Sequence, residues 1–351
     1  MIVLGANLTV DRTLQVERLV PGNVMRPRAA VVTAGGKSVN VCRASQAFGV
    51  RPQLIANLPG RTGELVGDLL DAEGHHVYRV RTAGEIRTST IVLEDDGRIT
   101  VLNEPGPELT SADRVSLLGA VAAHRAGERI LVASGSLPPG EAAADLYHEV
   151  TQVARAHGLR LILDAARGDL GAALPAGPDI VTPNLAEALA VLSSAQISEA
   201  VELDVPNLHE VALEAAVQLR AAGAGAALVT VGRHGVAGAD ADGVFWVRAP
   251  EVDEANAIGA GDAFVGGLAC SLEAGLSLRE ATARAVASGA ASVATDLAGR
   301  VDEVVLARLL SGGGPVWEPA EPPQVSALST AAPGSAGPRD RAVTSRRVGL
   351  R

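Results

Sequence analysis

Asn256-Ala257-Ile258-Gly259-Ala260-Gly261-Asp262-Ala263-Phe264 combines two glycines, an aspartate and the start of an apolar helical run. Glycines permit unusual backbone angles and let a ligand approach the backbone closely. The first turn of a helix has unpaired N–H groups and a partial positive charge, which together bind anions. The segment therefore predicts an anion site beside a carboxylate. Asp262 is either a catalytic group or a helix cap, since aspartate also favours that position.

Around this segment, short apolar runs alternate with longer helical patterns. The runs predicted as strands, mostly buried ones, are 2–4, 53–56, 129–133, 159–163, 179–181 and 226–231. The patterns predicted as helices are 38–48, 63–73, 112–124, 142–157, 185–192, 208–222, 263–274 and 278–296. This alternation predicts an α/β fold with a mainly parallel central sheet flanked by helices.

Two segments, 12–33 and 88–102, interrupt the alternation with β-rich patterns and polar turns. The second resembles a hairpin, because Glu94-Asp95-Asp96-Gly97 separates two runs rich in β-branched residues. We expect the two segments to pair into a small extra sheet outside the main domain. Its apolar face needs a partner, which is either the main domain or another subunit.

Composition limits the classes of function. The chain has 351 residues, 47% of them hydrophobic and only 2% aromatic, with a formal net charge of −10. Acidic charge and few aromatics argue against a nucleic-acid or anionic-membrane partner. Cys42 and Cys270 are expected to be buried and reduced, and the lack of an apolar span or leader pattern predicts a cytoplasmic protein. The length suits one large α/β domain or two medium ones, and a disordered tail is predicted over 312–351, rich in Pro, Ala, Ser and Gly and basic at its end.

Two further motifs place polar groups at predicted helix starts. Gly35-Gly36-Lys37-Ser38 follows an apolar strand and carries a lysine that suits a phosphate, although a flexible turn with an exposed lysine is the alternative. Thr182-Pro183-Asn184-Leu185-Ala186-Glu187 places an amide and a carboxylate three residues apart. That pair suits either hydrated Mg²⁺ or a capping box.

Other polar residues have weaker signals. Asp11 could accept hydrogen bonds from sugar hydroxyls or lie in an exposed turn. The glycine-containing segments after residue 133 and residue 229 either line a crevice or form ordinary turns. His75 and His76 are predicted to be a surface pair, because no metal-ligand spacing accompanies them.

The order of the motifs is more specific than any one of them. It runs Asp11-Arg12-Thr13, Gly35-Gly36-Lys37-Ser38-Val39-Asn40-Val41, Arg87-Thr88, Asn103-Glu104-Pro105-Gly106, Ser134-Gly135-Ser136-Leu137-Pro138-Pro139-Gly140, Pro183-Asn184-x-x-Glu187 and Gly259-Ala260-Gly261-Asp262. Over residues 1–310 this series resembles the ribokinase-like (phosphofructokinase-B) sugar kinases. Within them it is most similar to the hexose-phosphate kinase branch of 1-phosphofructokinase and tagatose-6-phosphate kinase.

The resemblance implies a single ribokinase-like domain over 1–311, with a β-sheet lid formed by 12–33 and 88–102. It also implies ATP, Mg²⁺ and a sugar phosphate, with a homodimer formed through the lid. It implies that Asp262 is the catalytic base and that Gly259, Ala260 and Gly261 form the anion hole. Residues implied around the phosphorylated sugar are Asp11, Gly35, Gly36, Lys37, Asn40, Arg87, Asn103 and Ser134. Residues implied at the nucleotide are Asn184, Thr230, Gly232, Gly235 and Ser288, with Asn184 and Glu187 ordering Mg²⁺ through water and Arg26 reaching the neighbouring subunit's sugar. The branch usually has lysine where this chain has Thr182.

The resemblance favours phosphorylation of fructose 1-phosphate to fructose 1,6-bisphosphate. The alternatives are a tagatose-6-phosphate or fructose-6-phosphate kinase, a kinase of a non-phosphorylated sugar or nucleoside, and a non-catalytic sugar-phosphate sensor. Lys37 and Arg87 argue against a neutral substrate, and Asp262 with Asn184 and Glu187 argues against a sensor.

Overall fold

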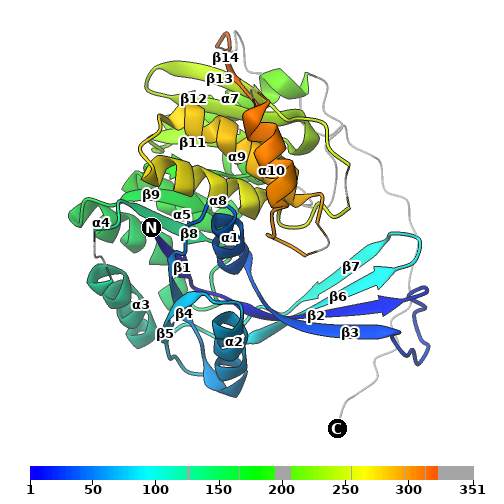
Figure 1. The fold of residues 1–351 in the computed structure, drawn as a ribbon. Helices are drawn as coiled ribbons and strands as arrows, with labels where there is room; N and C mark the ends of the chain where they lie inside the picture. Colours follow the sequence, from blue (N-terminus) through cyan, green and yellow to red (C-terminus); the bar gives the residue numbers. More distant parts are fainter. Residues whose placement is uncertain are drawn as a thin grey trace, which may run out of the picture.

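A computed structural model describes residues 1–322, except 125–126, 166, 194–206, 254, 296 and 313. Its main feature is a ten-stranded sheet in the order β14-β13-β12-β11-β10-β9-β8-β1-β4-β5 (Figure 1). The strands are β1 (Ile2–Gly5), β4 (Gln53–Asn57), β5 (His76–Val80), β8 (Ile130–Ser134), β9 (Arg160–Asp164), β10 (Ile180–Val181), β11 (Ala226–Thr230), β12 (Gly235–Asp240), β13 (Gly243–Arg248) and β14 (Trp317–Pro319). The seven strands from β11 to β5 are parallel, and β12 to β14 add to them in antiparallel fashion.

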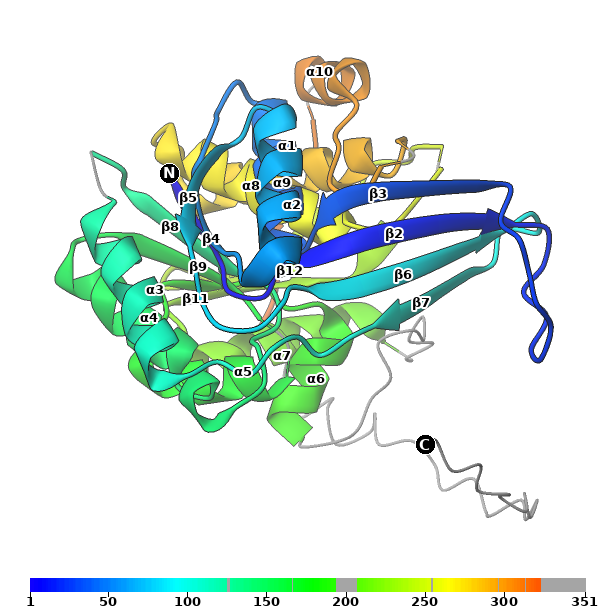
Figure 2. The ribbon, with the colours of Figure 1, turned by 90° about the horizontal axis from the view of Figure 1, so that it is seen from below.

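Two helical layers cover the sheet, as Figure 2 shows. One layer contains α3 (Ser111–Ala123), α4 (Leu146–Ala156), α5 (Arg167–Ala173), α6 (Leu185–Ser193) and α7 (Leu208–Ala221), and the other contains α1 (Lys37–Gln46), α2 (Gly60–Ala72), α8 (Ala260–Glu273), α9 (Leu278–Ser292) and α10 (Glu303–Ser311). The apolar residues at the start of the chain, Met1 and those of β1, show why both faces of the sheet must be covered. Ile2 and Leu4 join one hydrophobic core while Met1 and Val3 join the other, because alternate side chains point to opposite faces.

A separate four-stranded sheet projects from the body in the order β3-β2-β6-β7 (Figures 1 and 2). Its strands are β2 (Thr9–Val16), β3 (Ala29–Gly35), β6 (Arg87–Glu94) and β7 (Ile99–Asn103). The lid predicted from 12–33 and 88–102 is therefore confirmed as a small sheet. It begins earlier than predicted, at Thr9, and this earlier start brings the base of the lid next to the body.

The sequence-based expectations fail in specific places. Helices α5 and α10 and strands β5, β12, β13 and β14 were not predicted. Trp317–Pro319 pairs with β13, so this part of the expected tail belongs to the sheet. Residues 323–351, the rest of that tail, lie outside the described residues. No helix in the described ranges is long and apolar enough to span a bilayer.

Candidate active site

The polar motifs predicted from sequence converge at one edge of the central sheet. They lie at the carboxyl ends of β8 to β11, at the start of α1, α6 and α8, and at the base of the lid. Ligands of open α/β sheets bind outside the carboxyl ends of the strands. The fold therefore builds its candidate site where such sheets usually build one.

The glycine-rich turn before α8 is held by packing as well as by backbone angle. Gly259 caps the helix with a φ of 84°, and a Cβ there would lie 2.5 Å from the amide nitrogen of Gly299. A Cβ on Gly261 would instead meet open space among the described residues. The first-turn N–H groups of α8 have no acceptor within the helix, and the Ala260 N–H donates a 3.3 Å hydrogen bond to the carbonyl oxygen of Ala257 before it. The turn thus leaves room for an anion next to Asp262.

Asp262 lies in the first turn of α8 and is only 6% exposed. Asn40 Nδ2 donates a 2.8 Å hydrogen bond to Asp262 Oδ2. Burial raises the pKa of Asp262 to about 7, while the charge of Lys37 opposes the rise and Asp164 adds to it. A helix N-terminus alone would lower this pKa. Desolvation outweighs the helix dipole here.

Lys37 lies at the centre of the carboxylates. Its Nζ is 3.4 Å from Asp164 Oδ2 and 3.5 Å from Glu187 Oε1. Although burial opposes its charge, Asp164, Glu187 and Asp262 together raise the pKa of Lys37 above its ordinary value. The side chain remains 38% exposed, so a ligand can reach the ammonium group. The sequence predicted a phosphate-binding lysine but not these carboxylate partners.

Asn184 and Glu187 form the capping box that the sequence left as one alternative. The backbone N–H of Asn184 donates to Glu187 Oε2, and the backbone N–H of Glu187 donates to Asn184 Oδ1, both at 2.8 Å. Both Glu187 oxygens therefore have protein partners, since Oε1 faces Lys37. Within the described ranges no group of three or more His, Cys, Asp or Glu residues could hold a metal ion. These residues fit Mg²⁺ held mainly by substrate phosphates and water, which is its usual mode.

The base of the lid carries a polar row across its four strands. Thr33, Asp11, Ser89 and Asn103 are register partners in succession, and Ser89 Oγ donates to Asn103 Oδ1 at 2.6 Å. Asp11 Oδ1 is buried without a hydrogen-bond partner among the described residues. Burial raises the pKa of Asp11 to about 6, and Arg43 and Arg87 oppose the rise. An unsatisfied buried acceptor of this kind indicates a ligand that donates hydrogen bonds.

The Asp11 side chain leaves no room for a side chain at position 35. A Cβ on Gly35 would lie 2.1–2.2 Å from three atoms of the Asp11 carboxylate group. Gly36 follows with a φ of 112°, which favours glycine, and caps α1. Glycine is therefore needed at position 35 for space and at position 36 for its backbone angle. Both glycines allow Asp11 to lie next to the start of α1.

Arg87 contributes a positive charge on the lid side of the site. It donates to the carbonyl oxygens of Asn7 and Glu104 at 3.0–3.3 Å and forms no ion pair with a carboxylate in the described part of the chain. Burial lowers its pKa, and the nearby Asp11 opposes that change. The guanidinium is therefore fixed by carbonyl groups without being neutralised by a salt bridge.

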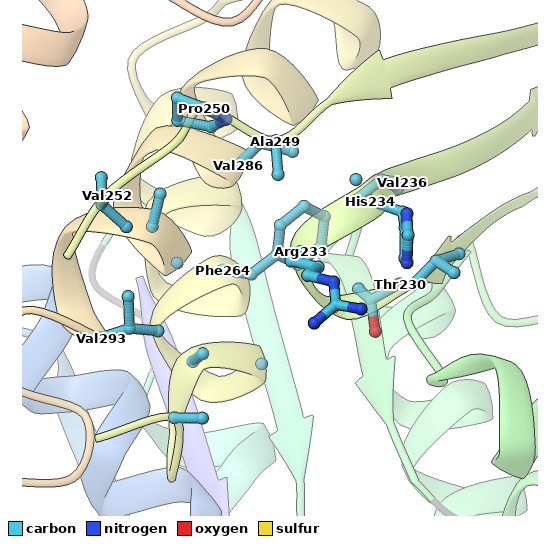
Figure 3. Close-up of a pocket in the computed structure, with 18 of the residues that line it drawn as sticks. Thr230, Arg233, His234, Val236, Ala249, Pro250, Val252, Phe264, Val286 and Val293 are labelled. Atoms are coloured by element: carbon cyan, nitrogen blue, oxygen red, sulfur yellow. The ribbon is translucent and has the colours of Figure 1, made fainter. Parts of the chain in front are cut away.

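A large pocket lies beside α8, with a volume of about 1290 Å³. Figure 3 shows Thr230, Arg233 and His234 on one side and Pro250, Val252 and Val293 on the other. Of the residues predicted at the nucleotide, those lining the pocket are Asn184, Thr230, Gly232 and Gly235. Ala260 and Gly261 also line it, which joins the pocket to the anion site. Phe264 and Arg308, which the sequence did not single out, line it as well.

Two predicted ligand residues are turned into the protein instead. Ser288 is fully buried, and its Oγ donates to the Ala263 carbonyl at 2.7 Å within the α8–α9 interface. Ser134 is 3% exposed and donates to Asp164 Oδ2 at 2.9 Å. Ser134 therefore supports Asp164, a residue that sequence reasoning missed. In the sequence, Asp164 is marked only as a single acidic residue at the end of a buried strand, a pattern too common to indicate a functional site.

The chain matches the model of the pfkB family carbohydrate kinases over residues 1–302. This chain belongs to the pfkB carbohydrate kinase family. It is therefore an ATP-dependent carbohydrate kinase with a ribokinase-like fold, and its relatives place it among the sugar-phosphate kinases.

The relatives include proteins with two different names. The chain is 32% identical to the 1-phosphofructokinase of Haloferax volcanii over 278 residues, which are 79% of this chain and 85% of that protein. It is 29% identical to the ATP-dependent 6-phosphofructokinase isozyme 2 of Mycobacterium tuberculosis over 296 residues, 84% of each. Among solved structures, phosphofructokinase-2 from Escherichia coli with potassium matches at a TM-score of 0.79 and 27% identity, covering 89% of this chain and 98% of that one.

Proposed function

We propose that this pfkB-family kinase transfers the γ-phosphoryl group of ATP to fructose 1-phosphate and forms fructose 1,6-bisphosphate. The observation that carries the proposal is the meeting of three parts at one place: the buried Asp262 at the anion site, the polar row around Asp11, and the large pocket beside α8. Several relatives at 31–34% identity are named 1-phosphofructokinase. Their names favour the 1-phosphate over the 6-phosphate as substrate.

A charged acceptor fits the lid side better than a neutral sugar. Arg87 is held in place by carbonyl groups and has no carboxylate ion-pair partner in the described ranges, so an incoming phosphate group would compensate its charge. Asp11 would accept hydrogen bonds from sugar hydroxyls with its unsatisfied Oδ1. Gly36, Asn40 and Asn103 would complete the sugar site. Lys37, between three carboxylates, would also face the phosphoryl group in transfer.

The chemical step follows from this placement. The 6-hydroxyl oxygen of the sugar attacks the γ-phosphorus, and the bond from that phosphorus to the β,γ-bridging oxygen breaks. ADP leaves with the bridging oxygen, and the hydroxyl proton passes to Asp262. The first-turn N–H groups of α8 stabilise the charge on the moving phosphoryl group. Mg²⁺, when bound to the phosphates and reached through water by Asn184 and Glu187, supplies further neutralising charge.

A substrate panel tests the proposal. ADP release is measured with ATP and, separately, fructose 1-phosphate, fructose 6-phosphate, tagatose 6-phosphate, fructose, ribose and adenosine. The highest kcat/KM is expected for fructose 1-phosphate. A higher value for a 6-phosphate would move the assignment to that substrate, and one for an unphosphorylated compound would reject the role of Arg87. No turnover together with thermal stabilisation by one sugar phosphate would indicate a sensor.

The pH dependence should report the environment of Asp262. Because Asp262 must be ionised to accept the proton, kcat/KM should fall below a pH of about 7. Lys37 lowers this pKa and Asp164 raises it, so Lys37→Met should move the acid limb to higher pH and Asp164→Asn should move it to lower pH. Ionisation of the substrate phosphate is common to all three enzymes and cancels in the comparison. Shifts in the same direction would contradict the assignment.

The lid is proposed to form a homodimer. Exposed apolar side chains gather on it, among them Val31, Val32, Val101 and Leu102. Arg26, exposed in the segment between β2 and β3, would then reach the sugar site of the neighbouring subunit. Phosphofructokinase-2 from Escherichia coli is described as tetrameric in its inhibited form, which supports self-association within the family.

Leu102→Asp should therefore halve the molar mass measured by light scattering after size exclusion. The matched control is Val115→Asp on α3, because Val115 is 66% exposed and Leu102 is 63% exposed. The control should keep the mass of the wild type. A monomeric wild type, or an unchanged mass for Leu102→Asp, would reject the lid dimer.

A further inference from the structure

One face of α1 carries a row of polar residues that runs from the site into the protein. Lys37, Asn40, Arg43 and Gln46 follow one another at intervals of three, so they lie along the same side of the helix. Lys37 and Asn40 belong to the site already described. Arg43 and Gln46 lie one and two turns behind Asn40, where the proposed reaction gives them no role.

Arg43 has an unusual setting for an arginine because its side chain is only 4% exposed. Its Nε and Nη2 donate to the two carboxylate oxygens of Glu73 at 2.8 and 2.7 Å. A two-armed contact of this kind fixes the plane of the guanidinium. The position of Arg43 is therefore set by Glu73, which follows the last residue of α2.

The remaining donors of Arg43 point toward the site. Nη1 donates to Asn40 Oδ1 at 3.1 Å, and Nη2 also donates to the Ala34 carbonyl at 2.7 Å. A guanidinium group has no acceptor, so the atom of Asn40 that faces it must be the carbonyl oxygen. The amide nitrogen of Asn40 then necessarily faces Asp262, to which it donates at 2.8 Å. Arg43 thus determines which way the Asn40 amide points.

The same guanidinium also supports the sugar side of the site. Ala34, whose carbonyl it binds, directly precedes Gly35 in β3. The charge of Arg43 also opposes the rise in the pKa of Asp11. One buried cation is therefore connected to the proposed base through Asn40, and its charge acts on the proposed sugar-binding acid.

Behind Glu73 the network continues to His75. The imidazole Nε2 lies 3.3 Å from Glu73 Oε2, and Nδ1 lies 3.4 Å from Gln46 Nε2. The side chain of His75 is 2% exposed, so the expectation of a surface histidine pair was wrong for this residue. Burial opposes ionisation of Glu73, but hydrogen bonds from His75 and Arg43 lower its pKa to about 2. Glu73 therefore stays charged and keeps Arg43 neutralised.

We infer that Arg43, held by Glu73, is a positioning residue for the phosphoryl transfer: it orients the Asn40 amide so that Asp262 keeps one oxygen bound and the other available to the acceptor hydroxyl. The inference rests on the proposed function, since it assigns Asp262 its role as base. Arg43 acts through Asn40 and does not touch the substrate. Loss of the groups that orient metal ligands in other proteins typically costs about ten- to a hundredfold, and we expect an effect of this order for the group that orients Asn40.

The experiment compares Glu73→Gln with a matched variant elsewhere. Glu73→Gln should lower kcat roughly tenfold, with a smaller change in KM for ATP, and Arg43→Lys should act in the same direction because lysine cannot make the two-armed contact. The control is Asp240→Asn, since Arg279 Nε and Nη2 donate to both oxygens of Asp240 at 2.9 and 2.8 Å in the same arrangement. Asp240 lies outside the site, so this variant should keep kcat. A kcat for Glu73→Gln within twofold of the wild type would overturn the inference.

A double-mutant cycle separates positioning from a general loss of stability. In the Asn40→Ala background, Glu73→Gln should change kcat less than twofold, because its route to Asp262 has been removed. The same tenfold loss in both backgrounds would mean that Arg43 does not act through Asn40.

A readout without turnover keeps the inference separate from the proposed function. The side-chain amide resonance of Asn40, assigned by its loss in Asn40→Ala, should shift with pH as Asp262 ionises. That dependence should be lost or weakened in Glu73→Gln and kept in Asp240→Asn. An unchanged dependence in Glu73→Gln would overturn the inference. A wild type that phosphorylates no sugar would reject the proposed function, and the resonance would still decide the orientation of Asn40.

Discussion

Asp262→Asn is expected to lower kcat by roughly 10²–10⁴, with little change in binding of the sugar phosphate. The substitution is close to isosteric, and an asparagine carbonyl can still accept the hydrogen bond from Asn40 Nδ2. What is lost is the ability to take the hydroxyl proton. The measurement is kcat with saturating ATP and sugar phosphate, together with calorimetric binding of the sugar phosphate. Near-normal turnover would show that Asp262 is not the catalytic base, and Gly259, not Asp262, is the cap of α8.

The same variant should be more stable than the wild type above neutral pH. The folded pKa of Asp262 is about 7, above the ordinary value of 3.8, so between these values the folded protein holds a proton that the unfolded chain has released. The stability from this group is complete below the lower value and is lost as the pH rises through 7. Asparagine does not ionise and avoids that loss. Urea unfolding at pH 8 should show a gain in the free energy of unfolding of at most about 4 kcal/mol.

Gly35→Ala is expected to raise the KM for the sugar phosphate by roughly 10–10², with kcat less affected. The added Cβ would lie 2.1–2.2 Å from the Asp11 carboxylate group, so that group must move away from its place in the site. Hydrogen bonds to a charged group contribute about 1.5–3 kcal/mol each, which corresponds to a loss of this size. The carboxylate is the end of a side chain and can move at small cost to the fold. The KM for the sugar phosphate should therefore rise while the melting temperature changes little.

Gly119→Ala is the matched control for Gly35→Ala. Gly119 lies within α3, and a Cβ there would meet nothing within 4 Å among the described residues. Alanine should stabilise that helix by about 0.5–1 kcal/mol and leave KM unchanged. Equal KM values for Gly35→Ala and the wild type would show that Asp11 does not bind the sugar.

The sequence predicted most of the parallel core because its strands are short apolar runs between helical patterns. It missed β12, whose Gly-Val-Ala-Gly-Ala-Asp sequence has little β-branched character, and β14, which is only three residues long. It placed the start of α8 three residues late, because glycine-rich segments have low helix propensity. Here the close packing of Gly259 against Gly299 and the tight turn at Gly259 outweigh the low helix propensity of the glycines.

The order of the motifs along the sequence was enough to indicate the family. The β-rich patterns predicted the small sheet, and the glycine-rich segment before α8 drew attention to Asp262 as a candidate catalytic residue. The tertiary structure decided what those residues do to one another. Asn40 and Asp262 are 222 positions apart, and Arg43 meets Glu73 across 30. The raised pKa of Asp262, the carboxylates around Lys37 and the orientation of Asn40 all depend on burial and on such distant contacts. Local pattern carries no information on desolvation, and desolvation is the largest effect on the ionisation of Asp262.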